Sequence, residues 1–187
     1  GAADSRGVAY DPDGLDLIKI VHLKKEGASV AAYVASGQRA QQTWDTKGKD
    51  AITLVSENEA DVLLEATPVN LKQGAEPGLT CVRTAMKRGM HVVTPNKGPL
   101  VMAYQELRDL AKRQGVRFLF DGTVAGGLPA INIGQRDLRG AKIYRLEAVP
   151  NLVTGYIIDL MMEGLSWDEA KTRAREEGVL EADPTWD

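Results

Sequence analysis

The fold is decided by residues 61–121, which read DVLLEATPVNLKQGAEPGLTCVRTAMKRGMHVVTPNKGPLVMAYQELRDLAKRQGVRFLFD. Short and nearly continuous apolar runs, typical of buried strands, occupy residues 61–66, 91–94 and 116–120. Between them, helical patterns cover residues 76–88 and 99–114, and each ends at a glycine, Gly89 or Gly115. Alternating strands and helices predict a Rossmann-like parallel sheet, and the apolar strands predict that helices cover both of its faces.

The residues before this stretch predict one more strand and one more helix. Residues 1–5 read as the end of a strand, and a helix is expected over about 14–26. The apolar side of that helix would consist of Leu17, Ile18, Ile20 and Val21. Residues 35–50 are polar and predict a surface helix or loop.

The sequence pattern of the chain changes after Asp121, and this change indicates a second domain. A Gly-rich turn at 124–129 leads into a helix, residues 141–149 alternate like a half-exposed strand, and a helix is expected over 151–162. The last helix is marked by a capping box of Ser166 with Glu169 and by a stop at Gly178. We therefore expect a first domain over 1–125 and the start of an α+β domain over 126–187.

Composition and charge exclude several classes of function. The 187 residues carry scattered charges that sum to −3, which argues against nucleic-acid binding. No apolar run reaches the length of a membrane span. The one cysteine, Cys81, lies in a helical pattern, so we expect it to be buried and the protein to be cytoplasmic.

Three loops follow the carboxyl ends of the predicted strands, where open parallel sheets bind their ligands. They are Thr67-Pro68, Asn96-Lys97 and residues 121–128. Thr67 offers a hydroxyl and an N–H to a ribose or nicotinamide, and Lys97 offers an ammonium that could polarise an oxygen. The alternatives are a plain strand end at Thr67 and a turn with a solvated lysine at Lys97.

Acidic residues near the two ends of the chain are further candidates. Asp4 ends its strand where a dinucleotide fold places the carboxylate that binds the ribose 2′-OH, whereas Arg6 would instead hold a 2′-phosphate. Residues 181–187 bring three carboxylates close together, as a substrate ammonium requires. A turn aspartate and a solvated acidic turn are the respective alternatives.

Taken together, these pieces resemble homoserine dehydrogenase. The motifs that carry the resemblance, in chain order, are Asp-Ser-Arg-Gly at 4–7, Asp-Gly-Leu-Asp at 13–16, Glu-Ala-Thr-Pro at 65–68, His-Val-Val-Thr-Pro-Asn-Lys at 91–97, Thr-Val-Ala-Gly-Gly-Leu-Pro at 123–129 and Glu-Ala-Asp-Pro-Thr-Trp-Asp at 181–187. They stand in the order and roughly at the spacing of that family.

The resemblance implies roles for individual residues. Residues at the nicotinamide side of an NAD(P) cofactor would be Thr67, Pro68, Asn96 and Lys97, and Lys97 would also face the substrate. Backbone carbonyls would hold a monovalent cation, usually sodium, at Asp121, Val124, Gly126 and Leu128, although the family usually has Glu where Asp121 stands. The substrate would be bound by Asn151, Glu181 and Asp187.

The resemblance also implies a reaction, the NAD(P)-dependent interconversion of aspartate semialdehyde and homoserine by a homodimer. Leu152-Val153 stand where the family has Gly-Thr, so a non-catalytic nucleotide-binding relative is one alternative. Another amino-acid or semialdehyde dehydrogenase of the same layout is a second.

The family's Gly-rich fingerprint would lie before Gly1 and its catalytic Asp and second Lys after Asp187. We therefore expect these 187 residues alone to be an inactive internal fragment, poorly stable as a monomer, with open edges on the strands at 1–4 and 61–66.

Overall fold

The computed structural model of the chain describes residues 1–34, 45–148 and 152–180. Contacts within the chain divide it into two compact units, Gly1–Thr123 and Val124–Asp187. Each unit is described by itself.

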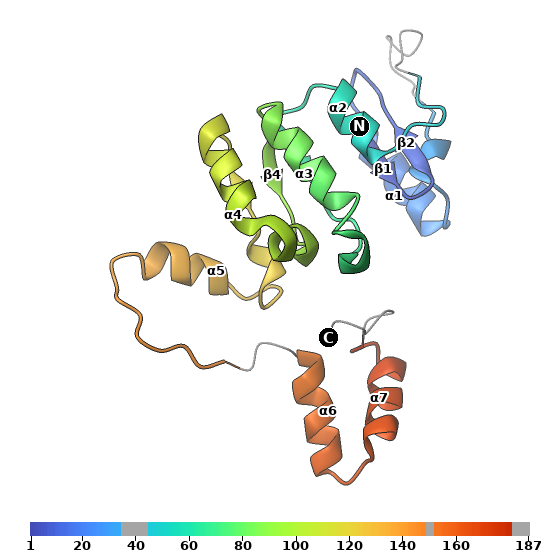
Figure 1. The fold of residues 1–187 in the computed structure, drawn as a ribbon. Coiled ribbons are helices and arrows are strands. Elements are labelled where there is room, and N and C mark those ends of the chain that lie inside the picture. The colour runs from blue at the N-terminus through green and yellow to red at the C-terminus, as the bar shows by residue number, and fades with distance from the viewer. Residues whose placement is uncertain (35–44, 149–151, 181–187) are drawn as a thin grey trace. The chain divides into compact units, whose positions relative to one another are not determined.

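The first unit contains the predicted parallel sheet. Three strands, β3 (Val62–Leu64), β4 (His91–Val93) and β5 (Phe118–Leu119), pair in the order in which they occur in the chain. Leu63 lies opposite Val92, and Val92 lies opposite Phe118. The expected mixed α/β class with a parallel sheet and flanking helices is confirmed (Figure 1).

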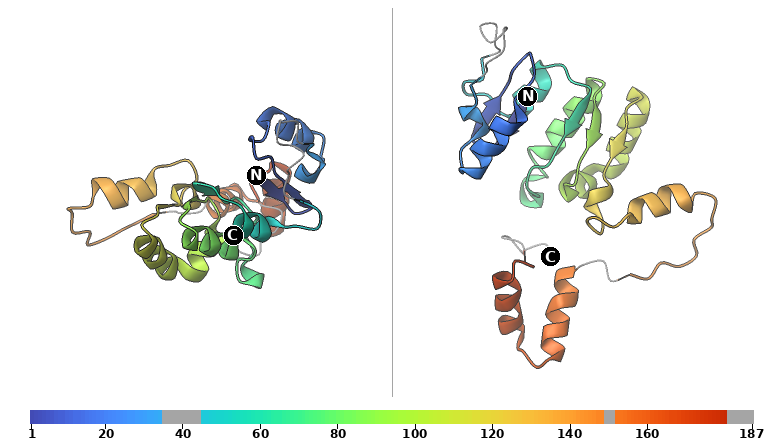
Figure 2. Two further views of the ribbon diagram at one scale, coloured as in Figure 1. Left: turned by 90° about the horizontal axis from the view of Figure 1, so that it is seen from above. Right: turned by 180° about the vertical axis from the view of Figure 1, so that it is seen from behind.

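The helices that connect these strands build the main core. The helix α3 (Gly78–Lys87) joins β3 to β4, and α4 (Lys97–Gln114) joins β4 to β5. Both helices lie on the same face of the sheet (Figures 1 and 2). Each helix belongs to a crossover of the same hand between parallel strands, and both crossovers lead across the sheet in the same direction, so both helices come to lie on the same side. The helix α2 (Ala51–Glu57) packs beside α3. Side chains with at most 1% exposure at the centre of this core are Cys81, Val82, Ala85, Met86, Val92 and Leu107.

The other face of the sheet departs from the prediction of cover on both sides. Val62, Leu64, Val93 and Leu119 point away from α3 and α4, and among the described residues they remain exposed, Leu64 to 76%. Alternate residues of a strand point to opposite faces, so one set is buried and the other is not. The apolar runs are therefore correct for the strands, and within the described part of the chain one face of the sheet is covered by α3 and α4 while the other is exposed.

The strand predicted at residues 1–5 exists, but it belongs to a different sheet. β1 (Ala2–Asp4) pairs antiparallel with β2 (Gly7–Ala9), and Ala3 lies opposite Val8. In the described residues this hairpin is separate from the parallel sheet. The chain after β2 forms α1 (Leu17–Lys25) and the short 3-10 helix η1 (Val30–Ala32).

The helix α1 begins later than predicted and buries less. It begins at Leu17 because the side chain of Asp16 accepts hydrogen bonds from the N–H groups of Ile18 (3.0 Å) and Lys19 (3.2 Å). Leu17, Ile18 and Val21, expected on the buried side, are all exposed, and only Ile20 of the predicted apolar set is half-buried.

The helix α4 begins two residues earlier than predicted, at Lys97. Asn96 caps it by accepting a hydrogen bond from Gly98 N (2.9 Å). Pro99 lies within the first turn, where a missing N–H breaks no helical hydrogen bond. The backbone of Ala103 is non-helical, which marks a kink within α4.

Two short 3-10 helices follow strands of the first unit, η3 (Leu71–Gln73) and η4 (Asp121–Thr123). The second unit begins with one helical turn, α5 (Ala130–Asn132), continued by the π-helical turn η5 (Ile133–Asp137). The strand predicted over 141–149 is not found in residues 141–148, which are all exposed. Alternation alone cannot make a strand without a neighbouring strand to pair with.

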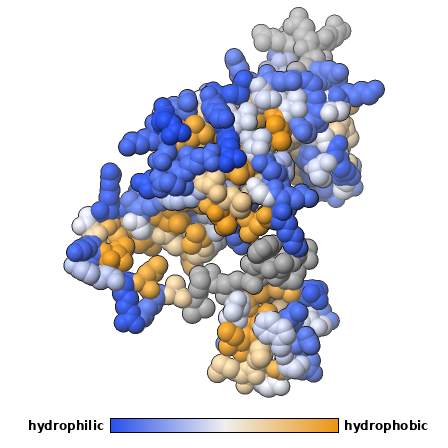
Figure 3. All heavy atoms as spheres, viewed as in Figure 1, coloured by the Kyte–Doolittle hydropathy of each residue, from blue (hydrophilic) through white to orange (hydrophobic). Residues whose placement is uncertain are grey.

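Two helices complete the second unit, α6 (Leu152–Met162) and α7 (Trp167–Glu176). They pack through Ile157, Leu160, Ala170, Ala174 and Leu180. The predicted capping box of Ser166 and Glu169 is confirmed, and the stop at Gly178 has the expected positive φ of 71°. Leu152 and Met162 of α6 are largely exposed, and apolar colouring is visible on the surface of the second unit in Figure 3.

Among the described helices, none combines the length and the apolar character that crossing a bilayer requires.

Candidate functional site

The carboxyl ends of β3 and β4 meet in a set of polar side chains. Glu65 follows β3, and Thr94 and Asn96 follow β4. All three side chains are buried, with exposures of 3%, 2% and 4%. Buried polar groups must be hydrogen-bonded to be tolerated, and here the partners are one another.

Glu65 is the acceptor at the centre of this set. Its Oε2 accepts a hydrogen bond from Thr94 Oγ1 (2.6 Å), and its Oε1 accepts from Thr67 N (2.8 Å) and Asn96 Nδ2 (3.3 Å). The hydroxyl of Thr67 also donates to Oε1. The carboxylate therefore joins the ends of two neighbouring strands.

Asn96 connects this set to α4. Its Nδ2 donates to Thr67 Oγ1 (3.2 Å) as well as to Glu65, its Oδ1 accepts from Gly98 N, and its own N–H donates to Thr94 Oγ1 (2.9 Å). The structure thus brings the predicted cofactor residues Thr67 and Asn96 into direct contact. Lys97 comes next in the chain, as the exposed first residue of α4.

Two glycines allow the surrounding backbone to approach closely. A Cβ at Gly78 would lie 2.9 Å from Asn96 Nδ2 and 2.9 Å from Thr67 Oγ1. A Cβ at Gly98 would lie 2.9 Å from the Cβ of Ala75. The first turns of α3 and α4 therefore pack against the polar set without room for a side chain.

A cleft of about 820 Å³ in the first unit brings together three of the predicted cofactor residues, Asp4, Thr67 and Pro68. Its volume lies within the range usual for small-molecule sites. Glu65 also lines it, together with apolar residues such as Leu54 and Leu64. Among the described residues its lining does not include Arg6, Asn96 or Lys97, although Asn96 reaches it through Thr67.

Asp4 is the second carboxylate at the centre of a hydrogen-bond set. Its Oδ1 accepts from Ser29 Oγ (2.8 Å) and Arg6 N (2.9 Å), and its Oδ2 accepts from Lys24 Nζ (2.7 Å) and Val30 N (2.9 Å). Burial alone would raise the pKa of Asp4, but these hydrogen bonds outweigh burial and hold the pKa well below its ordinary value. Asp4 thus ties β1 to η1 and α1.

Arg6 lies in the turn between β1 and β2 and is exposed. Its Nη2 donates to the carbonyl of Gly27 (2.6 Å), which ties the turn to the end of α1. Asp4 and Arg6 thus lie close together, as their spacing predicted, and both have structural partners.

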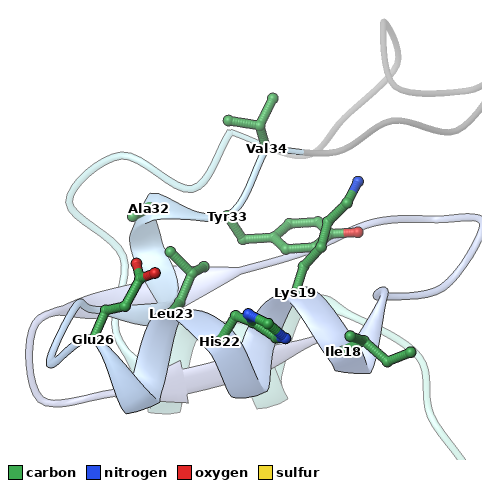
Figure 4. Close-up of a pocket in the computed structure, with 8 residues that line it drawn as sticks. All are labelled: Ile18, Lys19, His22, Leu23, Glu26, Ala32, Tyr33 and Val34. Atoms are coloured by element: carbon green, nitrogen blue, oxygen red, sulfur yellow. The ribbon is translucent and has the colours of Figure 1, made fainter.

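A second hollow, of about 520 Å³, lies between α1 and η1 (Figure 4). Lys19, His22 and Glu26 line it from one side of α1, and Tyr33 lines it from the chain after η1. The hydroxyl of Tyr33 accepts from Asp16 N (3.0 Å), so it stabilises the start of α1. None of the site residues predicted from the sequence lines this hollow within the described chain.

The remaining predicted residues fall in two groups. The cation candidates span the boundary between the units, with Asp121 in the first and Val124, Gly126 and Leu128 in the second. The substrate candidates Asn151, Glu181 and Asp187 lie outside the described residues. Side chains of His, Cys, Asp or Glu form no metal-binding group of three in the described residues.

The single cysteine is buried as expected, with an exposure of 1%. Burial, with smaller contributions from nearby carboxylates, raises the pKa of Cys81 to about 12, so the thiol stays protonated and unreactive. His91 has a structural partner, because its Nδ1 accepts a hydrogen bond from Arg117 N (3.1 Å).

Sequence reasoning missed Glu65 and Thr94 as members of the site. The signal was present, because a charged residue at the end of an otherwise apolar strand is unusual unless it is paired. What the sequence could not supply was the partner across the neighbouring strand.

Comparison with known families gives two matches in this chain. The model of the homoserine dehydrogenase NAD-binding domain matches residues 21–121, and the model of homoserine dehydrogenase matches residues 129–187.

Comparison with individual proteins also matches this chain to homoserine dehydrogenases. A homoserine dehydrogenase of Methanocaldococcus jannaschii is 38% identical over 185 residues, which cover 98% of this chain and 52% of that protein. An NAD(+)-dependent homoserine dehydrogenase of Pseudomonas canavaninivorans is 36% identical over 163 residues, or 87% of this chain and 46% of that protein. The chain thus spans about half the length of these relatives. A solved structure, a hyperthermophilic archaeal homoserine dehydrogenase mutant in complex with NADPH, is 27% identical with a TM-score of 0.80, and the match covers 98% of this chain and 53% of that one.

The lowered pKa of Asp4 leads to a prediction about stability. Because the folded state favours the ionised carboxylate, its stabilisation should be present above the unfolded pKa of about 4 and be lost as the pH falls below it. Asp4→Asn should lower the free energy of unfolding at about pH 7 by about 1–3 kcal/mol, the usual scale for bonds to a charged group. The difference from the wild type should shrink at about pH 3.

Urea unfolding at both pH values measures this effect. Asp109→Asn, an exposed aspartate on α4, is the matched control and should change the free energy of unfolding by less than about 0.5 kcal/mol. An equal loss in both variants at neutral pH would contradict the role given to Asp4.

Proposed function

The chain belongs to the homoserine dehydrogenase family, and we propose that the full-length protein catalyses the NAD(P)-dependent interconversion of L-homoserine and L-aspartate 4-semialdehyde. The observation that carries the proposal is that models of both domains of this enzyme match, in order, 21–121 and 129–187. The NADPH complex and the NAD(+)-dependent relative support NAD(P) as the cofactor class.

Each part of the chain then has a proposed task. Residues 1–125 would bind NAD(P), and 126–187 would belong to the catalytic and dimerisation domain of a cytoplasmic homodimer. The cleft lined by Asp4, Thr67 and Pro68 supports a nucleotide site in the first part, because it lies beside the end of a parallel strand. Substrate carboxylate and ammonium recognition would fall to Asn151, Glu181 and Asp187.

The residues at the sheet edge have distinct chemical roles in this proposal. The nicotinamide cofactor, when bound, supplies the hydride acceptor or donor. Thr67 and Asn96, which are hydrogen-bonded to each other, would orient its reactive end. Lys97 would place its ammonium at the oxygen of the substrate, where it stabilises the negative charge that develops as the hydroxyl proton leaves.

We also propose that the loop after β5 holds a sodium ion through backbone carbonyls of Asp121, Val124, Gly126 and Leu128. Two successive residues of this loop, Ala125 and Gly126, have left-handed φ values of 58° and 57°. Positive φ values allow a tight backbone turn at this point, and hard cations prefer oxygen ligands such as backbone carbonyls.

One observation favours a second function, a nucleotide-binding relative without catalysis. Leu152 and Val153 stand where the family has Gly-Thr, and Leu152 begins α6 with its side chain 79% exposed. A branched side chain at this point hinders close approach of a substrate to the backbone. Turnover of homoserine by the full-length protein would exclude this alternative.

The first prediction from the proposed function concerns Lys97. In the full-length protein, homoserine should reduce NAD(P)⁺, and Lys97→Ala should lower kcat by about a hundredfold or more, the usual scale for losing a positioned charge or proton relay. Absorbance of NAD(P)H measures the rate. Lys112→Ala, an exposed lysine in the last turn of the same helix, is the control and should keep the wild-type rate. A wild-type rate in Lys97→Ala would remove Lys97 from the site.

The second prediction concerns the choice between NAD and NADP. If Arg6 faces the 2′ position, its guanidinium should pair with a 2′-phosphate, so Arg6→Ala should weaken NADPH binding about tenfold or more and NADH binding little. Titration followed by nicotinamide fluorescence measures both constants. Arg108→Ala, an exposed arginine on α4, controls for the loss of one positive charge. Equal losses for the two nucleotides would show that Arg6 acts only through its bond to Gly27.

The third prediction concerns sodium. After exchange into a buffer of a large organic cation, homoserine oxidation should slow and should recover when Na⁺ is added. Gly126→Val should raise the half-saturating Na⁺ concentration about tenfold, because a branched residue at positive φ is strained by about 1–2 kcal/mol. Gly127→Ala, at a neighbouring position without positive φ, should leave it unchanged. Activity independent of Na⁺ would count against the cation site.

A further inference from the structure

We propose that Glu65 is a positioning residue of this site, whose buried carboxylate fixes Thr67 and Asn96 relative to each other and, through Asn96, sets the place of Lys97. The inference rests on the proposed function and deepens it, because it names the residue that orients the side chains proposed to face the cofactor. Glu65 acts through the groups that it binds.

The first step is the placement of the charge. Glu65 is 3% exposed and follows β3 directly, and its charge adds to the effect of burial in raising the pKa of the nearby Cys81 thiol. A buried carboxylate is costly unless hydrogen bonds replace its water. An apolar residue would serve stability as well or better at such a position, so the carboxylate indicates a requirement beyond stability.

The second step is how its acceptors are used. Oε1 accepts from the N–H and hydroxyl of Thr67 and from Nδ2 of Asn96, while Oε2 accepts from Thr94. The donors come from the loop after β3 and from the loop after β4. A carboxylate accepts at both oxygens, whereas a glutamine would present a donor in place of one acceptor, so the hydrogen bond with Thr94 would have to reverse its direction.

The third step leads from Glu65 to Lys97. The backbone N–H of Asn96 is bound to Thr94, its Nδ2 is bound to Glu65 and Thr67, and its Oδ1 is bound to the N–H of Gly98. The residues on both sides of Lys97 are therefore fixed by side chains of this set. The origin of the lysine side chain is set by these bonds, while its ammonium stays on a long stem.

The fourth step is the lack of space for other arrangements. The carboxylate lies beside the first turn of α3, where a Cβ at Gly78 would come within 3.0 Å of Glu65 Oε1. The same Cβ would also meet Thr67 and Asn96 at 2.9 Å. The positive end of α3 favours a negative charge there, and the contact holds the set in one geometry.

The test uses Glu65→Gln and Glu65→Ala in the full-length protein. Steady-state rates with homoserine should fall about tenfold in kcat/KM for the first variant and about a hundredfold for the second, since small displacements of a reacting group have effects of this size. Affinity for ADP-ribose, which lacks the nicotinamide ring, should change less than twofold. Affinity for NAD(P)H should fall by more than affinity for ADP-ribose, because Thr67 and Asn96 face the nicotinamide end.

Two sets of controls separate positioning from stability. Glu106→Gln removes an exposed carboxylate that accepts from Arg83 Nε (2.8 Å) and Nη2 (2.6 Å), so it should lower the melting temperature but leave both nucleotide affinities and kcat/KM unchanged. Thr94→Ser keeps the hydroxyl bound to Glu65 and should behave like the wild type. Thr94→Val removes that hydroxyl at equal size and should resemble Glu65→Gln, and the two effects should not add in the double variant.

Each outcome of these measurements tests either the positioning role of Glu65 or the proposed function. Wild-type kcat/KM in both Glu65 variants, or equal losses of affinity for NAD(P)H and ADP-ribose, would overturn the positioning role. Absence of homoserine turnover in the wild type would instead overturn the proposed function. In that case the comparison of NAD(P)H with ADP-ribose still tests Glu65, because binding needs no chemistry.

Discussion

One buried carboxylate organises the edge of the parallel sheet. Glu65 accepts hydrogen bonds from the loops after β3 and β4, so the ends of these strands cannot separate without leaving a buried charge unsatisfied. The cap of α4 belongs to the same set, because Asn96 binds Glu65 with one side-chain atom and Gly98 with the other. The pairing of β3 with β4, the start of α4 and the geometry of the two loops therefore depend on the same set of hydrogen bonds.

A second carboxylate that lines the cleft, Asp4, has a similar task. Asp4 gathers four donors from its own turn, α1 and the start of η1, as Glu65 gathers donors from two loops. Both residues line the cleft of about 820 Å³. The first unit thus places two carboxylates in the lining of one cleft, and each of them accepts hydrogen bonds from its own set of donors.

The sequence was informative where a local rule determines the structure. The stops at Gly89 and Gly115 and the capping box at Ser166 were predicted because a glycine or a capping side chain acts on its own neighbours. The sequence pattern led to wrong predictions where the local structure depends on a partner that is distant in the sequence. Residues 141–148 alternate correctly yet form no strand, and Leu64 is apolar yet exposed, because periodicity does not reveal what lies opposite. For the site, Thr67 and Asn96 were predicted, whereas Glu65 required knowledge of the pairing between β3 and β4.

Lys97 is an exposed residue whose neighbours in the chain are held by hydrogen bonds. Asn96 and Gly98 hold the backbone on both sides of the lysine, and Gly98 has no room for a Cβ against Ala75. The side chain itself is exposed at the first turn of α4. In the proposed reaction the ammonium of Lys97 would meet an oxygen whose charge changes, so the position of the backbone that carries it matters. The hydrogen bonds that Asn96 makes to Thr94, Glu65 and Gly98 would supply that fixed position.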